Sequence, residues 1–309
     1  MDNITNTGTV QNESPPLNNV EEVYQTYKKK SQFKEFWRRF KKSKTALMGL
    51  ILLVSLLVVT LIVSLTIPYQ MALDQNVMIK LQRPSGEHWF GTDNYGRDIF
   101  SRIFHGAKYS LLIGLTAVGM GITTGCLLGS VAGYFGGVVD TVIMRVIDTI
   151  ACIPFTLLAL SIVAALGSGL FNLLIALVLA NIPMYTRVIR SAMLTVIDME
   201  YIEAARACGT PDRKIIFKHI LPNALGVIIV QATMTFGSMI ISASTMSFLG
   251  MGIQPPTPEW GSMLSEGKSY MMYAPHIVLF PGFAIVLTVL SLNLMGDGLR
   301  DALDPRLKD

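Results

Sequence analysis

Long apolar segments alternate with shorter polar ones along most of this chain of 309 residues. A helix that crosses a bilayer needs about 20 predominantly apolar residues, because the hydrocarbon core is about 30 Å thick. Six segments are long enough, although the fourth needs help from its flanks. We therefore expect an all-α integral membrane protein with six transmembrane helices. The six segments are Ala46–Ile67, Ser110–Gly133, Ile150–Leu166, Phe171–Tyr185, Ala224–Ser247 and His276–Met295.

Lys and Arg are distributed unevenly over the polar segments between these helices. If the N-terminus lies inside, 19 of the 25 Lys and Arg fall on inner segments, nine of them between Lys28 and Lys44. The positive-inside rule then predicts that both termini are cytoplasmic. The same distribution indicates that the excess positive charge, a net +4, anchors the chain at the membrane surface. It does not indicate a nucleic-acid-binding surface.

The residues before the first apolar segment divide into two parts. Residues 1–31 are expected to form a disordered cytoplasmic tail, because most of them are polar and show no periodicity. Residues 32–45 place aromatic side chains at helical spacing among Lys and Arg, which predicts an amphipathic interfacial helix; the alternative is an ordinary basic flank. The first apolar segment, residues 46–67, begins too late and is too long for a cleaved secretion signal, so we expect it to remain as a span.

A short polar segment separates the fourth and fifth apolar segments. Met199–Cys208 consists of strong helix formers, with Asp198 as the expected N-cap, and Gly209 supplies the left-handed residue that ends many helices. A second helix is expected to begin at Thr210-Pro211, as cap and first helical position, and to end or kink at Pro222. The sequence therefore predicts a basic protrusion of two short helices joined by a glycine.

Three ordered motifs in the chain resemble those of a known family. Glu203-Ala204-Ala205 with Gly209, followed by Ile220-Leu221-Pro222, resembles the EAA loop of type I ABC importer permeases. His88–Gly114 and Gly296–Arg306 resemble the peptide and nickel importer branch, specifically the C-type permease subunit of dipeptide and oligopeptide systems. The resemblance extends from Phe33 to the C-terminus.

This resemblance implies a fold, partners and a site. It implies the type I ABC importer permease fold, a homologous second permease subunit, two ABC ATPase subunits and an extracellular solute-binding protein. ATP and Mg²⁺ would bind to the ATPase subunits, and this chain would hold no cofactor, no metal and no catalytic residue. The residues expected to couple to the ATPase are Glu203, Ala204, Ala205, Arg206, Gly209, Pro211 and Pro222.

The second apolar segment has a glycine at every fourth position. Such spacing leaves a groove along one face of a helix, so that another backbone can approach closely. Two interpretations remain open: a tight interface that can slide, within or between permease subunits, and permanent packing in the core. The residues are Gly121, Gly125, Gly129 and Gly133.

The fifth apolar segment carries one polar stripe. At 100° per residue its members fall within an arc of about 80° on one helix face. Polar side chains in a span normally face a water-filled cavity or a partner helix, so the stripe either lines a translocation path or forms helix-packing hydrogen bonds. The members are Gln231, Thr235, Ser238, Ser242 and Thr245.

Several kinds of chemistry are not supported by the sequence. The expected spans have no Asp, Glu, Lys or Arg away from their margins, which argues against an ion-coupled carrier. Gly267-Lys268-Ser269 lacks the upstream spacing of a phosphate-binding loop. Asp93 and Asp98 are the best candidates for a catalytic carboxylate pair, but the flanking Arg97 and Arg102 favour a turn held by ion pairs.

The sequence therefore predicts a permease subunit of an ABC importer for peptides or similar small solutes. The alternative is a secondary transporter or channel that works alone. We expect an extracellular loop over residues 68–109 and a five-helix permease core over residues 110–296. This core includes a cytoplasmic coupling loop (187–223) and an extracellular loop (249–275), and a cytoplasmic tail follows (297–309). The long loop 249–275 is expected to contact a delivery protein or the substrate.

Overall fold

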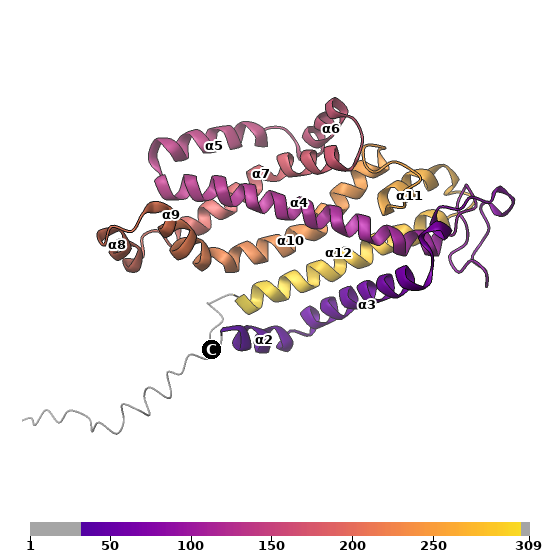
Figure 1. Cartoon of the computed structure of the whole chain (residues 1–309), viewed down its shortest axis with the longest axis horizontal. Coiled ribbons are helices and arrows are strands. Elements are labelled where there is room, and N and C mark those ends of the chain that lie inside the picture. The colour runs from indigo at the N-terminus through magenta and orange to yellow at the C-terminus, as the bar shows by residue number, and fades with distance from the viewer. Residues whose placement is uncertain (1–31, 304–309) are drawn as a thin grey trace, which may run out of the picture.

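The computed structural model describes residues 32–303, with side chains from residue 36, and this part of the chain is helical without β-strands. Five long helices run side by side (Figure 1), and each is long and apolar enough to cross a membrane. The expected tail over residues 1–31 and the last residues of the C-terminal tail lie outside the described residues. The five helices are α3 (Lys44–Thr66), α4 (Ile99–Phe135), α7 (Leu170–Leu194), α10 (Leu221–Phe248) and α12 (His276–Leu303).

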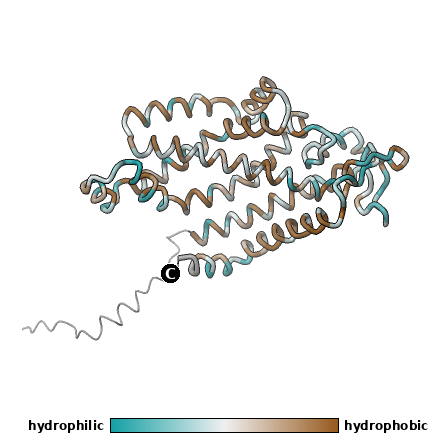
Figure 2. Tube along the Cα trace, in the orientation of Figure 1, coloured by the Kyte–Doolittle hydropathy of each residue, from teal (hydrophilic) through white to brown (hydrophobic). Residues whose placement is uncertain are grey.

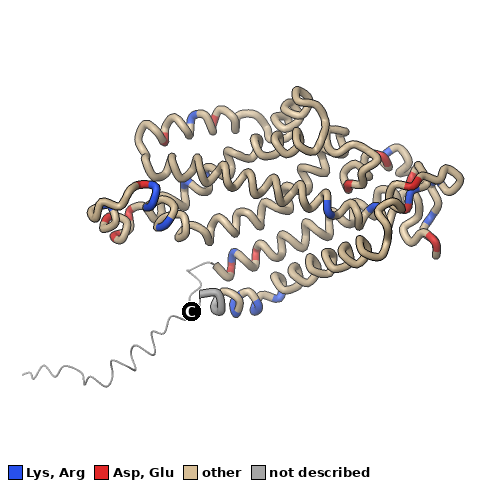
Figure 3. The backbone as a smooth tube through the Cα atoms, viewed as in Figure 1, with Lys and Arg blue, Asp and Glu red and all other residues tan. Residues whose placement is uncertain are grey.

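Polar and charged residues gather at the two ends of this bundle (Figures 2 and 3). One end carries the short helices α8 (Glu200–Ala207) and α9 (Asp212–Lys214), which protrude beyond the long helices (Figure 1). The other end carries the loop after α3, with the 3₁₀ turns η1 (Tyr69–Ala72) and η2 (Val77–Ile79), and helix α11 (Trp260–Gly267), which the 3₁₀ turn η4 (Lys268–Tyr270) follows. The apolar middle matches the bilayer and the two polar ends match its two aqueous sides.

The third expected span is broken. The sequence predicted one helix over Ile150–Leu166, but the structure has α5 (Gly137–Ala151) and α6 (Phe155–Leu166), bent by 85° at a short break. Pro154 explains the break, because proline has no backbone N–H and restricts the residue before it to extended conformations. The bundle has six spans if this bent pair counts as one, and five otherwise.

Four other spans are longer than the apolar segments that predicted them, including α12, which continues past Met295 to Leu303. Helix α4 begins at Ile99 because the Asp98 carboxylate accepts a hydrogen bond from the Ser101 backbone N–H, at 2.7 Å. Helix α7 continues through Pro183 to Leu194. Helix α10 is the end of a continuous helical segment that begins at α9 and includes a π-helical turn, η3 (Ile215–Ile220). Hydropathy detects only the apolar part of a helix, so it missed these polar extensions.

The extension of α7 places charged residues inside a candidate span. Arg187 donates to the Asp148 carboxylate of α5 at 2.8 Å, and Arg190 donates to both carboxylate oxygens of Asp140 at 2.5 Å. The expected span Phe171–Tyr185 has no charged residue, and both arginines lie on the helical extension that the sequence did not predict. The charges are tolerated because each arginine on α7 has an acidic partner on α5.

The N-terminal helix α2 (Gln32–Lys42) is separate from α3, and Ser43 lies between them. The Ser43 hydroxyl accepts a hydrogen bond from the Ala46 backbone N–H at 3.3 Å, which caps α3. Phe40 of α2 is buried with Ala46 and with Ala302 of α12. This contact joins α2 to the last described helix of the chain.

Candidate functional site

The protruding segment at one end of the bundle, Glu200–Ile220, has a small apolar core of its own. Ile202 of α8 is fully buried, and it packs in one cluster with Ile215, Ile216 and Ile220 of η3 and with Met193 of α7. The cluster joins residues of several elements, so α8 is fixed against the ends of α7 and α10. We call Glu200–Ile220 the elbow.

The turn between α8 and α9 depends on Gly209. Its φ is +73°, the left-handed conformation that the sequence predicts there. The backbone N–H of Thr210 donates to Ala205 O at 3.1 Å, and that of Gly209 donates to Arg206 O at 2.9 Å. These two bonds form a Schellman motif, which satisfies the last carbonyl groups of α8.

The expected helix caps of the elbow are wrong. Met199, not Asp198, precedes the first residue of α8, and Pro211, not Thr210, precedes α9; neither helix has a side-chain cap. Packing of Ile202 and the Schellman motif position α8 instead. The first backbone N–H groups of α8 and α9 therefore have no side-chain acceptor at the cap position.

Pro222 does not end the second helix of the elbow. It lies in the first turn of α10, directly after the π-helical turn η3. A wider turn leaves more room for the proline ring, which otherwise clashes with the preceding turn of a helix. The second half of the elbow and α10 consequently form one continuous helical segment from Asp212 to Phe248.

The residues of the EAA motif lie mainly on the outer face of the elbow. Glu203, Ala204 and Arg206 are exposed, as are Gly209 and Pro211, whereas Ala205 is half-buried. Because Ile202 is buried on the opposite side, α8 presents a small, mostly polar surface away from the bundle.

Tyr134, at the end of α4, ties the elbow to the bundle. Its hydroxyl donates to the Asp212 carboxylate at 2.6 Å, and the Arg206 guanidinium lies 5.2 Å from the centre of its ring. The sequence does not point to Tyr134, because nothing in it indicates that the end of the second span contacts a segment 78 residues away.

The glycine face of α4 packs against α7 of the same chain. A methyl group at Gly125 would lie 2.5 Å from Tyr185 Cβ, and one at Gly129 would lie 2.8 Å from the Thr186 carbonyl oxygen. Gly121 meets the Tyr185 ring, and Gly133 meets Met193. The structure therefore places the four glycines at a contact between two helices within this chain.

The polar stripe of α10 divides into two parts. Thr235 is buried and accepts a hydrogen bond from the Tyr185 hydroxyl of α7 at 3.1 Å, so this member packs against a neighbouring helix. Ser238 and Thr245 are exposed, and Gln231 and Ser242 are half-buried. The hydroxyls of the serine and threonine members donate to backbone carbonyls of α10 itself.

The opposite end of the bundle contains a buried ionic cluster. Arg97 donates to the Asp93 carboxylate at 2.6 Å and to Glu266 Oε2 at 2.8 Å, while Arg102 donates to the same Glu266 oxygen at 2.9 Å. Both arginine side chains are 1% exposed, so each needs its acidic partner. The carboxylate that caps α4, Asp98, also contacts His88 Nδ1 at 2.8 Å. These contacts agree with the expected turn held by ion pairs and show the sequence-distant Glu266 at its centre.

The long loop between α10 and α12 is folded around a buried carboxylate, Glu259. This side chain accepts hydrogen bonds from the backbone N–H groups of Gly261 and Ser262 at 2.9 and 2.8 Å, and from the Ser110 hydroxyl at 3.2 Å. Burial raises the pKa of the Glu259 carboxyl, and the hydrogen bonds from these donors act in the opposite direction. The next residue, Trp260, is fully buried and donates to Ile103 O of α4 at 2.9 Å. Helix α11 is therefore fixed against α4.

No group of three or more His, Cys, Asp or Glu side chains within residues 32–303 could hold a metal ion. The polar features of the described structure are instead an exposed elbow at one end, a partly polar helix in the middle and a buried ionic cluster at the other end. The second half of the elbow, from Asp212, and the α10 stripe belong to one continuous helical segment.

The fold is that of an ABC importer permease. The structure is similar to a chain in an inward-facing form of the MetNI methionine ABC transporter, with a TM-score of 0.52 and 20% sequence identity, over 64% of this chain and 94% of that one. A second crystal form of the same transporter gives a TM-score of 0.51, over 67% of this chain and 96% of that one.

The sequence shows the family. Residues 125–309 match the binding-protein-dependent transport system inner membrane component family, and residues 31–84 match the N-terminal transmembrane domain of oligopeptide transport permease C. The dipeptide transport system permease protein DppC of Alkalihalophilus pseudofirmus is 47% identical over 278 residues, which cover 90% of this chain and 91% of that protein. The glutathione transport system permease protein GsiD of Pectobacterium atrosepticum is 43% identical over 279 residues, 90% of this chain and 93% of that protein. This chain belongs to the binding-protein-dependent inner membrane component family and is a multi-pass permease subunit of an ABC importer.

Proposed function

We propose that this chain forms half of the translocation pathway for dipeptides or similar small peptides. Its relatives are named as permeases for dipeptides and for glutathione, which is itself a small peptide with free carboxylates. A homologous second permease would supply the other half of the pathway, and an extracellular solute-binding protein would deliver the solute. Two ATPase subunits would bind ATP and Mg²⁺. A secondary transporter that works alone has no support from the family.

The exposed elbow is the observation that supports the proposal that an ATPase subunit drives this permease. Ala204 and Ala205 are small enough for α8 to enter a groove on a partner, and Glu203 can accept hydrogen bonds or pair with a basic group there. Gly209 joins α8 to the segment that continues into α10. Movement of the elbow is therefore expected to displace α10 and its polar stripe.

Within this proposal the exposed part of the stripe lines the solute path. Ser238 and Thr245 are exposed, and Ser242 is half-buried, on one face of α10. Their hydroxyls already donate to α10 carbonyls, so they offer acceptor lone pairs and small polar surfaces rather than strong binding groups. Thr235 has a different role, because it is buried against Tyr185 of α7.

Chemical crosslinking from the elbow tests this proposal. Cys208 follows α8 and is exposed, so it serves as a native attachment point once Cys126 and Cys152 have been replaced by alanine. We expect a short thiol-reactive crosslinker on Cys208 to join this chain to an ATPase subunit in membranes that contain the complete transporter. The product is measured by mass spectrometry.

The matched control is a cysteine at position 273 in the same background. Tyr273 is 79% exposed at the other end of the bundle, whereas Trp260 in the same loop is buried and unsuitable for labelling. Tyr273→Cys should react with a membrane-impermeant thiol reagent in intact cells and should not crosslink to the ATPase. Labelling of Cys208 from outside, or crosslinking from position 273, would show that the elbow is not on the cytoplasmic side.

A further inference from the structure

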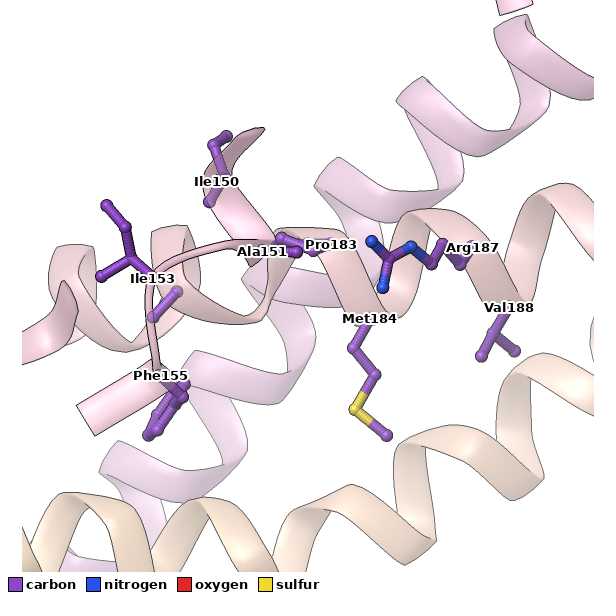
Figure 4. Close-up of a pocket in the computed structure, with 9 residues that line it drawn as sticks. Ile150, Ala151, Ile153, Phe155, Pro183, Met184, Arg187 and Val188 are labelled. Atoms are coloured by element: carbon purple, nitrogen blue, oxygen red, sulfur yellow. The ribbon is translucent and has the colours of Figure 1, made fainter. Parts of the chain in front are cut away.

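A cavity of about 370 Å³ opens where α5 breaks from α6, beside the middle of α7. Figure 4 shows the residues that line it, which come from the end of α5, the start of α6 and one face of α7. We call this cavity the break cleft. Its lining consists of Ile150, Ala151, Ile153, Phe155, Ala180, Pro183, Met184, Arg187 and Val188.

The walls of the break cleft are apolar apart from one cation. Arg187 is the single charged side chain that lines it. Figure 4 shows its guanidinium extending from α7 toward the break between α5 and α6. A cavity of a few hundred Å³ with apolar walls and one well-placed polar group has the usual properties of a site for a small molecule.

The break itself indicates that the cleft faces protein or water rather than lipid. Cys152, Ile153 and Pro154 are exposed in this chain, and they form irregular backbone between two helices at 85° to each other. Irregular backbone within the hydrocarbon region is found only where it is covered by protein or lines an aqueous cavity. Broken helices within spans are also where several transporter folds bind their solutes.

Arg187 keeps most of its hydrogen-bonding capacity. It donates to Asp148 through one nitrogen, Nη2, at 2.8 Å, and the side chain is 47% exposed. Arg190, one turn further along α7, uses both Nε and Nη2 on the two oxygens of Asp140. A guanidinium has five N–H donors arranged to fit a carboxylate, so Arg187 can bind a second carboxylate beside Asp148.

We propose that the break cleft binds the carboxylate-bearing end of the solute on its way through the membrane. Arg187 binds the solute carboxylate, and the apolar walls contact the neighbouring side chain. The inference rests on the proposed function, because it assumes that the solute is peptide-like. Small peptides carry a C-terminal carboxylate next to a side chain of variable polarity, which matches one guanidinium among apolar and flexible residues such as Met184.

Replacement of Arg187 by glutamine tests the proposal in the complete transporter in proteoliposomes. The solutes are a dipeptide and the same dipeptide with its C-terminus amidated. We expect Arg187→Gln to lower uptake of the free acid by about tenfold or more, the usual effect of losing a hydrogen bond between charged groups, and to leave amide uptake unchanged. The selectivity of the solute-binding protein affects the wild type and Arg187→Gln equally, because the same binding protein delivers solute to both.

The matched control is Arg145→Gln. Arg145 is an exposed arginine of α5 that does not line the cleft, so this variant removes the same charge and should transport both solutes as the wild type does. Equal loss of acid and amide uptake in Arg187→Gln, or no loss of either, would overturn the proposal. If the wild-type transporter takes up neither solute, the result contradicts the proposed function rather than the role of the cleft alone.

A second measurement keeps the test valid if Arg187→Gln does not assemble. Met184 lines the cleft and is 46% exposed, so Met184→Cys places a thiol there while Arg187 remains. We expect an anionic methanethiosulfonate reagent to modify this thiol faster than a cationic one, and the free-acid dipeptide to protect it. No modification in the assembled transporter would show that lipid or the partner permease fills the cleft, and would contradict the proposal.

Discussion

Replacing Gly209 by valine is expected to lower ATP-driven uptake by about 100-fold, the upper range of measured coupling between sites, without preventing membrane insertion. Gly209 has a φ of +73°, which a β-branched residue adopts only under strain, and no neighbouring atom lies within 4 Å of the position that a Cβ would occupy there. The effect would therefore come from backbone strain in the Schellman motif, which changes the angle between α8 and α9. Uptake and ATP hydrolysis of the purified transporter in proteoliposomes measure it.

Gly209→Asn is the matched control, because asparagine tolerates the left-handed conformation better than any β-branched residue. We expect it to retain most of the uptake. Glu203→Lys is expected to lose uptake as Gly209→Val does, because it reverses the charge on the outer face of α8. Glu200→Lys makes the same charge change in the same helix and should have the smaller effect. Wild-type uptake and hydrolysis in both Gly209→Val and Glu203→Lys would refute the assignment of the elbow.

Gly129→Ala is expected to destabilise the folded chain by about 1–3 kcal/mol, the usual cost of overpacking. The added methyl group would meet two backbone atoms of α7, Thr186 O at 2.8 Å and Arg190 N at 2.9 Å. Backbone atoms cannot rotate away, so α4 and α7 would have to separate. We expect a lower midpoint of thermal unfolding and a lower yield of the detergent-purified protein.

Gly119→Ala controls for the substitution itself. Gly119 lies on the same helix with no atom within 4 Å of the added methyl group, and alanine favours a helix over glycine by about 1 kcal/mol. This variant should be as stable as the wild type or slightly more stable. If both variants had equal stability, the close contact between α4 and α7 would not contribute to the fold.

Hydropathy and charge predict the spans of this protein well where a helix is uniformly apolar. Helix α3 matches its expected segment to within two residues at each end, and the apolar middle of α4, α10 and α12 falls within the expected segments. Gly209 could also be predicted, because its left-handed φ depends on local backbone sterics alone. These features depend on residues that are neighbours in the sequence.

The features that sequence analysis missed depend on residues far apart in the chain. In the sequence, Arg187 indicates the end of a span. The structure shows that α7 continues past it and that Asp148 on α5 pairs with it. Glu266 in the ionic cluster pairs with Arg97 across 169 residues. A single sequence contains no information on which charges meet across such distances. Similarly, the bend at Pro154 was hidden because the residues on both sides of it are apolar.

One continuous helical segment connects the proposed coupling region and the proposed solute path, which the sequence indicates separately. The second half of the elbow, from Asp212, and the stripe are both parts of Asp212–Phe248, and Tyr134 and Ile202 hold the elbow against α4 and α7. A rigid connection of this kind is what coupling between an ATPase and a solute path requires. The π-helical turn η3 lies within this segment, between α9 and the stripe, and π-helical turns are frequent at functional sites.

Reconstitution tests the central claim most directly. This chain is purified together with a second permease, the ATPase subunits and the solute-binding protein, and is placed in proteoliposomes with a labelled dipeptide. We predict uptake that requires ATP, every other subunit and an intact elbow in this chain. Dipeptide uptake by this chain alone, driven by an ion gradient and indifferent to ATP, would contradict the account.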